Sequence, residues 1–212
     1  GQSYDSVILN CSAHVDLTTV SVSGSALAGG IVGLDGFSIL ANSYAMGSIY
    51  ADAGVNAATI GGIAGMQAGV AGNNYSDMKL TSKNATGDIG GIAGRNQASG
   101  QIVSCSFEGK VQGTTATGGI AGQNGGTIRH CTNTGSVNID NIDSALSLSD
   151  IQIDTTLDLA NLATTQTFLT TTATGGIAGR NTGLIAVCEN TGTVGYEHVG
   201  YNVGGIAGVT SG

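Results

Sequence analysis

Gly61-Gly62-Ile63-Ala64-Gly65 is a five-residue phrase that occurs six times in the chain, unchanged or with one residue replaced. The other copies begin at Gly29, Gly90, Gly118, Gly175 and Gly204, so successive starts lie 32, 29, 28, 57 and 29 residues apart. A period of this size is typical of repeat architectures, in which units stack because a single unit cannot bury its apolar face alone. The repeat therefore decides the fold.

Two aliphatic positions follow the first five phrases at similar distances, and an equivalent pair precedes the first phrase. The first is occupied by Ile8, Ile39, Val70, Ile102, Ile128 and Ile185, and the second by Leu17, Ile49, Leu80, Val111, Val137 and Val194. Short apolar segments between Gly, Asn, Ser and Thr turns are typical of strands, whereas two helices in one period would need longer apolar faces and fewer glycines. We predict an all-β fold, a right-handed parallel β-helix (β-solenoid) with about 28–29 residues and three short strands per coil.

The period predicts a single β-solenoid domain over residues 1–212, interrupted at 139–172 by an insertion or a degenerate coil. This segment contains no Lys or Arg and holds the calcium candidates Asp140, Asp143, Asp150, Asp154 and Asp158. Clustered carboxylates can bind calcium, but their spacing here fits no calcium-loop pattern. We expect no cofactor and no catalytic residue in the chain.

The amino-acid composition argues against some classes of binding partner. The net charge is −8, from fourteen acidic and six basic residues, and the basic residues are scattered, so nucleic acid is not an expected partner. Charged residues make up 9% and hydrophobic residues 41%, which indicates a folded chain rather than a disordered one. No apolar run is long enough for a transmembrane segment. No leader pattern opens the chain, so we expect a processed product or a segment of a longer protein.

One stretch resembles a known repeat. Residues 33–49, which include Asn42-Ser43-Tyr44-Ala45-Met46-Gly47-Ser48-Ile49, resemble the GLUG repeat, in which a glycine-hydrophobic-x-Gly segment precedes an Asn-Gly turn and Asn-Ser-Tyr-Ala-Thr-Gly-Ser-Val. Residues 119–137 and 176–194 are similar to the same unit, and the resemblance covers nearly the whole chain outside 139–172. GLUG repeats occur in bacterial surface or secreted proteins, including adhesin-like proteins and the non-catalytic repeat regions of immunoglobulin A-specific peptidases.

The resemblance implies a structural or adhesive repeat module of a bacterial extracellular or cell-surface protein, which forms a rigid stalk or stacks end to end into a fibre. Expected partners are neighbouring copies or flanking repeats of the same protein, by end-to-end β-stacking, and a host glycan or protein is a further candidate. The two chain ends have complementary phase within the repeat, which fits either a window of a longer solenoid or a self-assembling subunit.

We expect the chain not to be an enzyme. Zinc peptidases need a His-Glu-x-x-His helix, whereas His14, His130 and His198 stand alone. The alternative is a carbohydrate-active β-helix enzyme or a carbohydrate-binding module. Glycoside hydrolysis needs paired carboxylates, and outside 139–172 the acidic residues are isolated in the sequence.

Two structural columns are predicted from the repeat. The core column contains Ile31, Ile63, Ile92, Ile120, Ile177 and Ile206, and a second stacked column, three residues after the first aliphatic position, contains Cys11, Asn42, Asn73, Cys105, Cys131 and Cys188. Within the second column, Asn42 and Asn73 would form a stacked amide pair. We expect the cysteines to be buried free thiols, and the alternatives are a bridge between Cys105 and Cys131 or a metal site.

Further polar residues recur just after the glycine phrase. Asn96, Asn124 and Asn181 are predicted to be turn residues that tolerate left-handed backbone. Arg95 and Arg180 occupy the matching turn, where they would be solvated or would bind an anionic sugar or a carboxylate.

Overall fold

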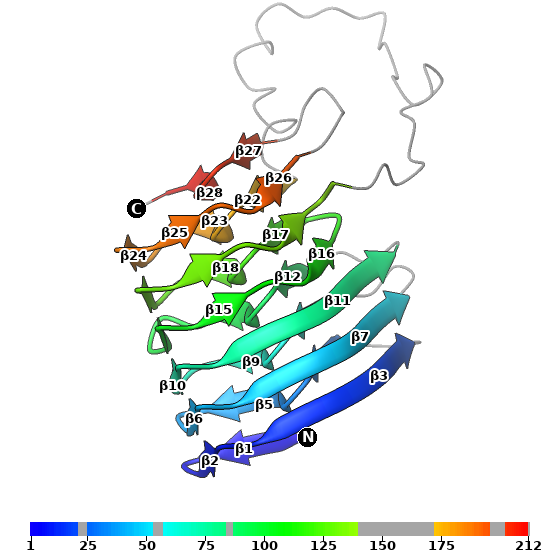
Figure 1. Ribbon diagram of the computed structural model, residues 1–212, viewed down its shortest axis with the longest axis vertical. Helices are drawn as coiled ribbons and strands as arrows, with labels where there is room; N and C mark the ends of the chain where they lie inside the picture. The colour runs from blue at the N-terminus through cyan, green and yellow to red at the C-terminus, as the bar shows by residue number, and fades with distance from the viewer. Residues whose placement is uncertain (21–24, 53–56, 84–86, 140–171, 196–201, 212) are drawn as a thin grey trace, which may run out of the picture.

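The computed structural model describes residues 1–20, 25–52, 57–83, 87–139, 172–195 and 202–211. Its regular structure consists of strands β1 to β28, which form four sheets that we call A, B, C and D. The strands lie one above another along the long axis of the molecule (Figure 1). Within the described ranges, no helix is long and apolar enough to cross a membrane.

Sheets A and B hold the strands that follow the glycine phrase. Sheet A contains, in spatial order, β1 (Gln2–Tyr4), β5 (Val32–Gly36), β9 (Ala64–Gln67), β13 (Ala93–Asn96), β18 (Ala121–Asn124), β23 (Ala178–Asn181) and β28 (Ala207–Thr210). Sheet B contains β2 (Val7–Leu9), β6 (Ile39–Ala41), β10 (Val70–Gly72), β14 (Gln101–Val103), β19 (Thr127–Arg129) and β24 (Leu184–Ala186).

Sheet C changes along the molecule, because its first strands are continuous and its later ones are divided in two. The continuous strands are β3 (Ser12–Val20), β7 (Tyr44–Asp52) and β11 (Tyr75–Lys83); the divided ones are β15 (Ser106–Phe107) with β16 (Lys110–Gln112), β20 (Thr132–Asn133) with β21 (Ser136–Val137), and β25 (Glu189–Asn190) with β26 (Thr193–Val194). Sheet D contains β4 (Ala26–Gly29), β8 (Ala58–Gly61), β12 (Asp88–Gly90), β17 (Ala116–Gly118), β22 (Ala173–Gly175) and β27 (Asn202–Gly204).

The predicted parallel β-solenoid is confirmed. Each strand pairs in parallel with its equivalent about one period away, as Tyr75 does with Tyr44 in sheet C and Ile89 with Ile60 in sheet D. The predicted number of strands per coil is wrong, because a coil passes through four sheets rather than three. The glycine phrase causes the difference, since it is a corner between two strands: β12 ends at Gly90, and β13 begins at Ala93.

The glycines of this corner permit close approach of backbone to backbone. A Cβ atom added at Gly122 would lie 2.4 Å from the backbone nitrogen of Ile89, so the two sheets that meet at the corner leave no room for a side chain. A Cβ atom at Gly91 would lie 2.3 Å from the Phe107 ring, on the opposite wall of the coil. The glycines of the phrase therefore allow the walls of the coil to approach each other closely.

The second aliphatic column has the predicted register. Leu17 pairs with Ile49, Ile49 with Leu80, and Leu80 with Val111, and the ladder continues to Val137 and Val194. Ile49, Leu80, Val111 and Val137 are fully buried. Stacked aliphatic side chains of this kind form the core of the coil, and burial of each contributes roughly 1.5–3 kcal/mol.

The predicted insertion or degenerate coil at 139–172 falls almost entirely outside the described residues. The strands on either side of it pair directly with each other, since Ala116 of β17 is in register with Ala173 of β22.

Candidate functional site

The predicted isoleucine column lies at the corner between sheets D and A. Its six members are joined by successive backbone hydrogen bonds of 2.9 to 3.0 Å, from Ile31 N to Ile63 O and onward to Ile177 N and Ile206 O. Ile63, Ile92, Ile120 and Ile177 are fully buried, whereas Ile206 in the last coil is 43% exposed. The column belongs to the core and presents nothing to a ligand.

The cysteine column contains different partners from those predicted. The register places Cys11 beside Ser43, Ser43 beside Asn74, and Asn74 beside Cys105, which is followed by Cys131 and Cys188. Asn42 and Asn73 were expected in this column, and that is wrong by one residue. The cause is that the inward residues of sheet B are Leu40 and Ala71 rather than Ile39 and Val70. A shift of one residue moves every side chain of a strand to the other face.

All four cysteines are free thiols, with Cys105 and Cys131 buried, Cys188 half-buried and Cys11 exposed. Each thiol donates to the carbonyl oxygen two residues before it, as Cys131 Sγ does to Arg129 O at 3.2 Å. The hydrogen bond between Cys105 and Cys131 is the largest influence on these two groups: it lowers the pKa of Cys105 and raises the pKa of Cys131 to about 12. The pKa of Cys188 is raised by its hydrogen bond with Cys131 and then by burial. Cys131 and Cys188, whose thiolate forms are disfavoured, therefore pack as small apolar side chains.

The residue before each member of the cysteine column adopts left-handed backbone. These residues are Asn10, Asn42, Asn73, Ser104, His130 and Val187, with φ between 51° and 56°. Asn and His tolerate this region, whereas a β-branched residue such as Val187 is an outlier there. The conformation turns the chain from sheet B into sheet C, and it explains where Asn42 and Asn73 lie.

Asn96, Asn124 and Asn181 are inward-facing strand residues, which corrects their prediction as left-handed turn residues. They form a ladder along sheet A in which Asn96 Nδ2 donates to Asn124 Oδ1, and Asn124 Nδ2 donates to Asn181 Oδ1, both at 2.7 Å. The Asn96 and Asn124 side chains are buried. Their amide groups also donate to carbonyl oxygens of the next turn, as Asn124 Nδ2 does to Gly126 O at 3.3 Å. The solenoid therefore has a hydrogen-bonded polar column in its interior.

The same column is built differently in the first coils, where it contains Ser3, Asp35 and Gln67. The buried Asp35 carboxylate accepts hydrogen bonds from the backbone nitrogens of Ser38 at 3.1 Å and Gly69 at 2.9 Å. Gln67 is also fully buried, but neither its Nε2 nor its Oε1 has a hydrogen-bond partner. Its side chain is one methylene longer than Asn, so it does not continue the amide ladder.

A second amide hydrogen bond joins two adjacent coils along sheet C. Asn133 Nδ2 donates to Asn190 Oδ1 at 2.7 Å, and Asn133 also accepts from its own turn at Gly135 N at 3.0 Å. The preceding coil has Phe107 in register with Asn133. Glycine on the facing wall makes room for both kinds of side chain, since a Cβ atom at Gly119 would lie 2.4 Å from the Asn133 amide.

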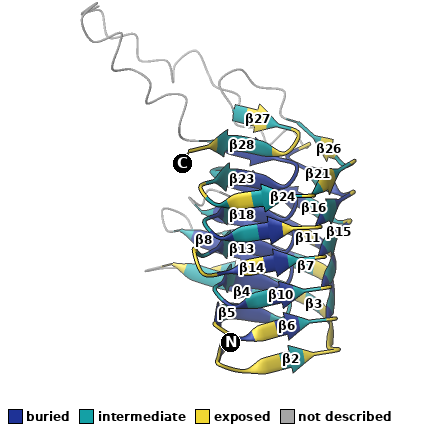
Figure 2. Cartoon of the chain, turned by 90° about the vertical axis from the view of Figure 1, so that its left-hand side faces the viewer, coloured by how far each residue is buried: buried dark blue, intermediate teal, exposed yellow. Residues whose placement is uncertain are grey.

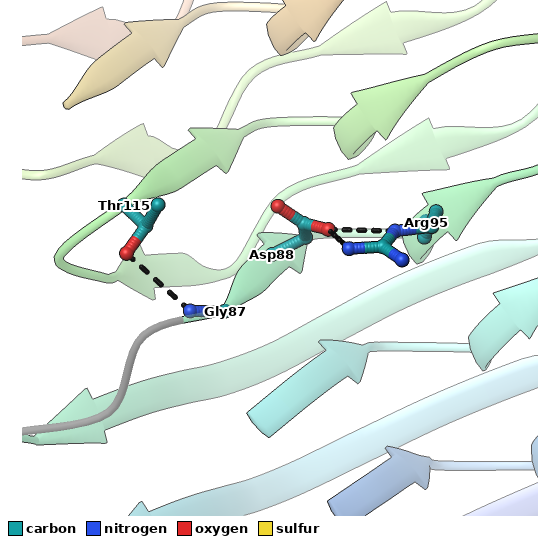
Figure 3. A network of polar contacts seen from close by, with 4 residues as sticks. All are labelled: Gly87, Asp88, Arg95 and Thr115. Carbon is teal, nitrogen blue, oxygen red and sulfur yellow. Dashed lines mark hydrogen bonds and ion pairs between the residues drawn. The ribbon is translucent and has the colours of Figure 1, made fainter. Parts of the chain in front are cut away.

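Arg95 is paired with an acidic residue of its own coil. Figure 3 shows the Arg95 guanidinium beside Asp88, with Nε donating to Asp88 Oδ2 at 2.7 Å and Nη2 contacting the same oxygen. Thr115 Oγ1 accepts from the backbone nitrogen of neighbouring Gly87 at 3.3 Å (Figure 3). Arg95 and Arg180 are strand residues in one outward column of sheet A, separated by Gln123, rather than turn residues. Because the Arg95 guanidinium is already paired with the Asp88 carboxylate, an anionic ligand would have to compete with Asp88 for it.

The outer face of sheet C has an aromatic stack. The Tyr44 and Tyr75 rings lie 5.1 Å apart and nearly parallel, and the His14 ring meets Tyr44 edge-on at 5.8 Å. Tyr75 Oη donates to Glu108 Oε2 at 2.7 Å. Burial, followed by this hydrogen bond, raises the pKa of Tyr75. The stacked rings cover each other's faces, so they leave little aromatic surface for a sugar ring.

The described residues contain no group of three or more His, Cys, Asp or Glu side chains that could hold a metal ion. The calcium candidates Asp140, Asp143, Asp150, Asp154 and Asp158 lie outside the described residues, as does His198. The described polar side chains that lie close together thus mainly form hydrogen bonds between neighbouring coils.

Comparison with known proteins agrees with this architecture. No curated protein and no solved structure matches the chain. Residues 113–138 match the family model described as the GLUG motif, and they comprise one coil, from β17 to β21. The resemblance to the GLUG repeat is confirmed for this coil, and the chain is consistent with a GLUG-repeat protein.

Proposed function

We propose that the chain is a structural or adhesive repeat module of a bacterial extracellular or cell-surface protein. The observation that carries the proposal is the in-register pairing of successive coils in all four sheets, which lets coils add along one axis. Buried ladders such as Asn96–Asn124–Asn181 link the coils from inside. A body built this way is stiff along its axis, as a stalk or fibre must be.

The same geometry supports the proposal of end-to-end stacking. The outer strands of each sheet, such as β1 and β28 in sheet A, have one paired neighbour each. A further coil would add its strands there, whether it belongs to the same chain or to a second copy. The expected partners are therefore flanking repeats or neighbouring copies, together with a host glycan or protein on the outer faces.

Small-angle X-ray scattering on the chain and on a tandem fusion of two copies tests the stalk. A single rod of about twice the length is the expected result, because stacked coils rise about 4.8 Å each. Two bodies that move independently would contradict the proposal. For the adhesive role, immunogold labelling should place the protein on the cell exterior, and deletion should reduce attachment to host surfaces.

The proposal assigns no catalytic activity to the chain. Incubation of the purified protein with pectin, alginate and hyaluronan should leave these polymers intact, as judged by reducing-end and unsaturated-uronate assays. Turnover of any of them would replace the structural proposal with that of a carbohydrate-active β-helix enzyme.

A further inference from the structure

Three polar atoms on the inner side of sheet A have no hydrogen-bond partner among the described residues. They are Nε2 and Oε1 of Gln67, which is 0% exposed, and Oδ1 of Asn96, which is 1% exposed. Asp35, Gln67 and Asn96 are consecutive members of the inward polar column, in the part of the stack that Figure 2 colours as buried. Nearly all buried polar groups of native proteins have a partner, and where no protein group provides it, a water or an ion does. We call the part of the column from Asp35 to Asn96 the oxygen column, and it is a candidate binding site.

The direction of the amide ladder explains why Gln67 is difficult to satisfy. Each ladder nitrogen donates to the oxygen one coil further on, from Asn96 to Asn124 and from Asn124 to Asn181. A side chain that continued this ladder from Gln67 would direct its nitrogen toward Asn96 Oδ1 and its oxygen toward Asp35. A carboxylate has no hydrogen to donate, so an acceptor would then face an acceptor. A group that joins the two must carry either positive charge or two hydrogens.

The buried charge of Asp35 adds to this requirement. Its carboxylate accepts hydrogen bonds from the backbone nitrogens of Ser38 and Gly69 and is fully shielded from solvent. The described residues place no basic side chain within ion-pair distance of it. Removing a carboxylate from water is costly unless its charge is compensated, and two neutral donors compensate it only in part. A cation beside Asp35 would complete the compensation, and a single positive charge would match that of the carboxylate.

Oxygen atoms predominate around the column. A Cβ atom built on Gly69 would lie 2.0 Å from Ser38 O and 2.8 Å from Asp35 Oδ2, so both oxygens border the backbone at a point where no side chain separates them. The partnerless atoms of the next two coils add two acceptors, Gln67 Oε1 and Asn96 Oδ1, against a single donor, Gln67 Nε2. Carboxylate, amide and carbonyl oxygens are the ligands that hard cations prefer. The excess of acceptors therefore favours a cation over a water molecule.

We propose that the oxygen column binds one Na⁺ ion between the Asp35 carboxylate and Gln67 Oε1. In-register side chains of successive coils stack at about 4.8 Å. An ion midway between their oxygens would lie about 2.4 Å from each, which is an ordinary distance between oxygen and a hard cation. A divalent ion would leave one positive charge uncompensated in the interior, so the single carboxylate favours a monovalent ion.

The ion would take the place of one step of the amide ladder. It would join the second coil to the third through Asp35 and Gln67, which are in register on β5 and β9. With its oxygen held by the ion, Gln67 could turn its nitrogen toward Asn96 Oδ1 and extend the ladder by one coil. The site is internal, so it is independent of the proposed adhesive role and of stacking at the ends of the solenoid.

Thermal unfolding in NaCl and in choline chloride at equal ionic strength tests the proposal, because choline is too large for a fully enclosed site. The wild type should gain roughly 5–10 °C in Tm when Na⁺ exceeds its dissociation constant a hundredfold. Asp35→Asn should abolish this sodium-specific gain, since the amide supplies a hydrogen in place of the ion. The matched control is Asp16→Asn, which alters an exposed carboxylate of sheet C and should leave the gain unchanged.

A second variant covers the case in which Asp35→Asn does not fold, since Asn offers one acceptor oxygen to the two backbone nitrogens that Asp35 satisfies. Gln67→Leu removes the facing amide oxygen and leaves those two bonds in place. In choline chloride it should be no less stable than the wild type. In NaCl it should lose at least tenfold in sodium affinity, measured as the Na⁺ concentration at which Tm begins to rise.

Equal Tm values of the wild type in the two salts would overturn the sodium site. A sodium-specific gain that both variants of the oxygen column retain would also overturn it, because the ion would then bind elsewhere. A high-resolution crystal structure of the wild type grown in NaCl gives an independent measurement. Density between Asp35 and Gln67 with oxygen neighbours at about 2.4 Å is expected for the ion. Neighbours at about 2.8 Å would identify a water and contradict the proposal.

Discussion

The inward polar column of sheet A is built in two ways along the molecule. In the later coils Asn96, Asn124 and Asn181 repeat one residue type and each amide donates to the next, while Asn96 Oδ1, on the side of Gln67, has no partner. In the earlier coils Asp35 is satisfied by backbone nitrogens, while the Gln67 amide, equally buried, has no partner. Identical residues at the coil spacing form a ladder, and unlike residues must find partners within their own coil.

The divided sheet C follows the same boundary. The first three coils have continuous strands of nine residues, with Met78 and Leu80 buried against the core. In the later coils Gly109 and Gly135 interrupt the strands, and Asn133 takes part in a second amide ladder. The early coils thus satisfy their buried polar side chains mainly with backbone groups, whereas the later coils add amide ladders that run from coil to coil.

Replacing Asn124 by Leu should have the largest effect on stability. The change leaves Asn181 Oδ1 without its donor and removes the bonds from Asn124 Nδ2 to Gly126 O and Leu184 O. Asn96 Nδ2 loses its shortest bond and keeps the longer ones to Gly100 O and Thr127 O. Buried unsatisfied polar groups cost roughly 1–3 kcal/mol each, so we expect a loss of about 3 kcal/mol in the free energy of unfolding. Urea denaturation followed by circular dichroism measures it. A loss below about 1 kcal/mol would show that the ladder contributes little.

The matched change Gln67→Leu, in the same column, should be neutral or stabilising by up to about 1 kcal/mol. No hydrogen bond of Gln67 is broken, and burying an unpartnered amide is itself unfavourable. The same denaturation experiment applies. If this variant loses as much stability as Asn124→Leu, the Gln67 amide has partners and the contrast between the two regions is removed.

Val187→Asn should stabilise the later coils by about 1 kcal/mol, because it relieves a β-branched residue at φ 53°. The reciprocal change Asn73→Val, at φ 51° in an earlier coil, should destabilise by a similar amount. Thermal unfolding of both variants provides the measurement. Equal effects of one sign would contradict the common backbone geometry of the two positions.

The rate of thiol alkylation should differ between the first coil, which contains Cys11, and the later coils, which contain Cys105 and Cys131. Cys11 is exposed and should react with iodoacetamide within minutes at pH 8, whereas the buried Cys105 and Cys131 should react only after unfolding. Alkylation needs the thiolate, and the pKa of Cys131 is raised to about 12 by the hydrogen bond with Cys105. Peptide mass spectrometry identifies the labelled sites. Rapid labelling of Cys131 in the folded chain would place it outside the core.

The register of two columns shows how far the sequence allows prediction. The predicted column from Leu17 to Val194 is correct because no residue directly next to its members in the sequence is another large aliphatic one. The predicted first aliphatic column is wrong by one residue at Ile39 and Val70, because the next residues, Leu40 and Ala71, are also apolar and are the ones that face inward. Alternation along a strand cannot decide which of two adjacent apolar residues faces inward. The misplacement of Asn42 and Asn73 in the cysteine column follows directly from that displacement.

The asparagines illustrate a different difficulty. Asn73 and Asn124 belong to the same residue type and lie near glycines, yet Asn73 turns the chain at positive φ and Asn124 is buried in a strand. Nothing in a single coil separates the two roles. An inward amide becomes favourable only when the next coil supplies a second amide at hydrogen-bond distance.

The sequence by itself determined that this protein winds into stacked coils, because one glycine-rich phrase recurs at intervals close to 29 residues, or about twice that, between short apolar segments. The tertiary structure alone decided which polar groups are buried and how many strands complete a coil. These properties depend on contacts between residues about 30 positions apart, where one coil rests on the next and hydrogen-bond partners are supplied across the stack.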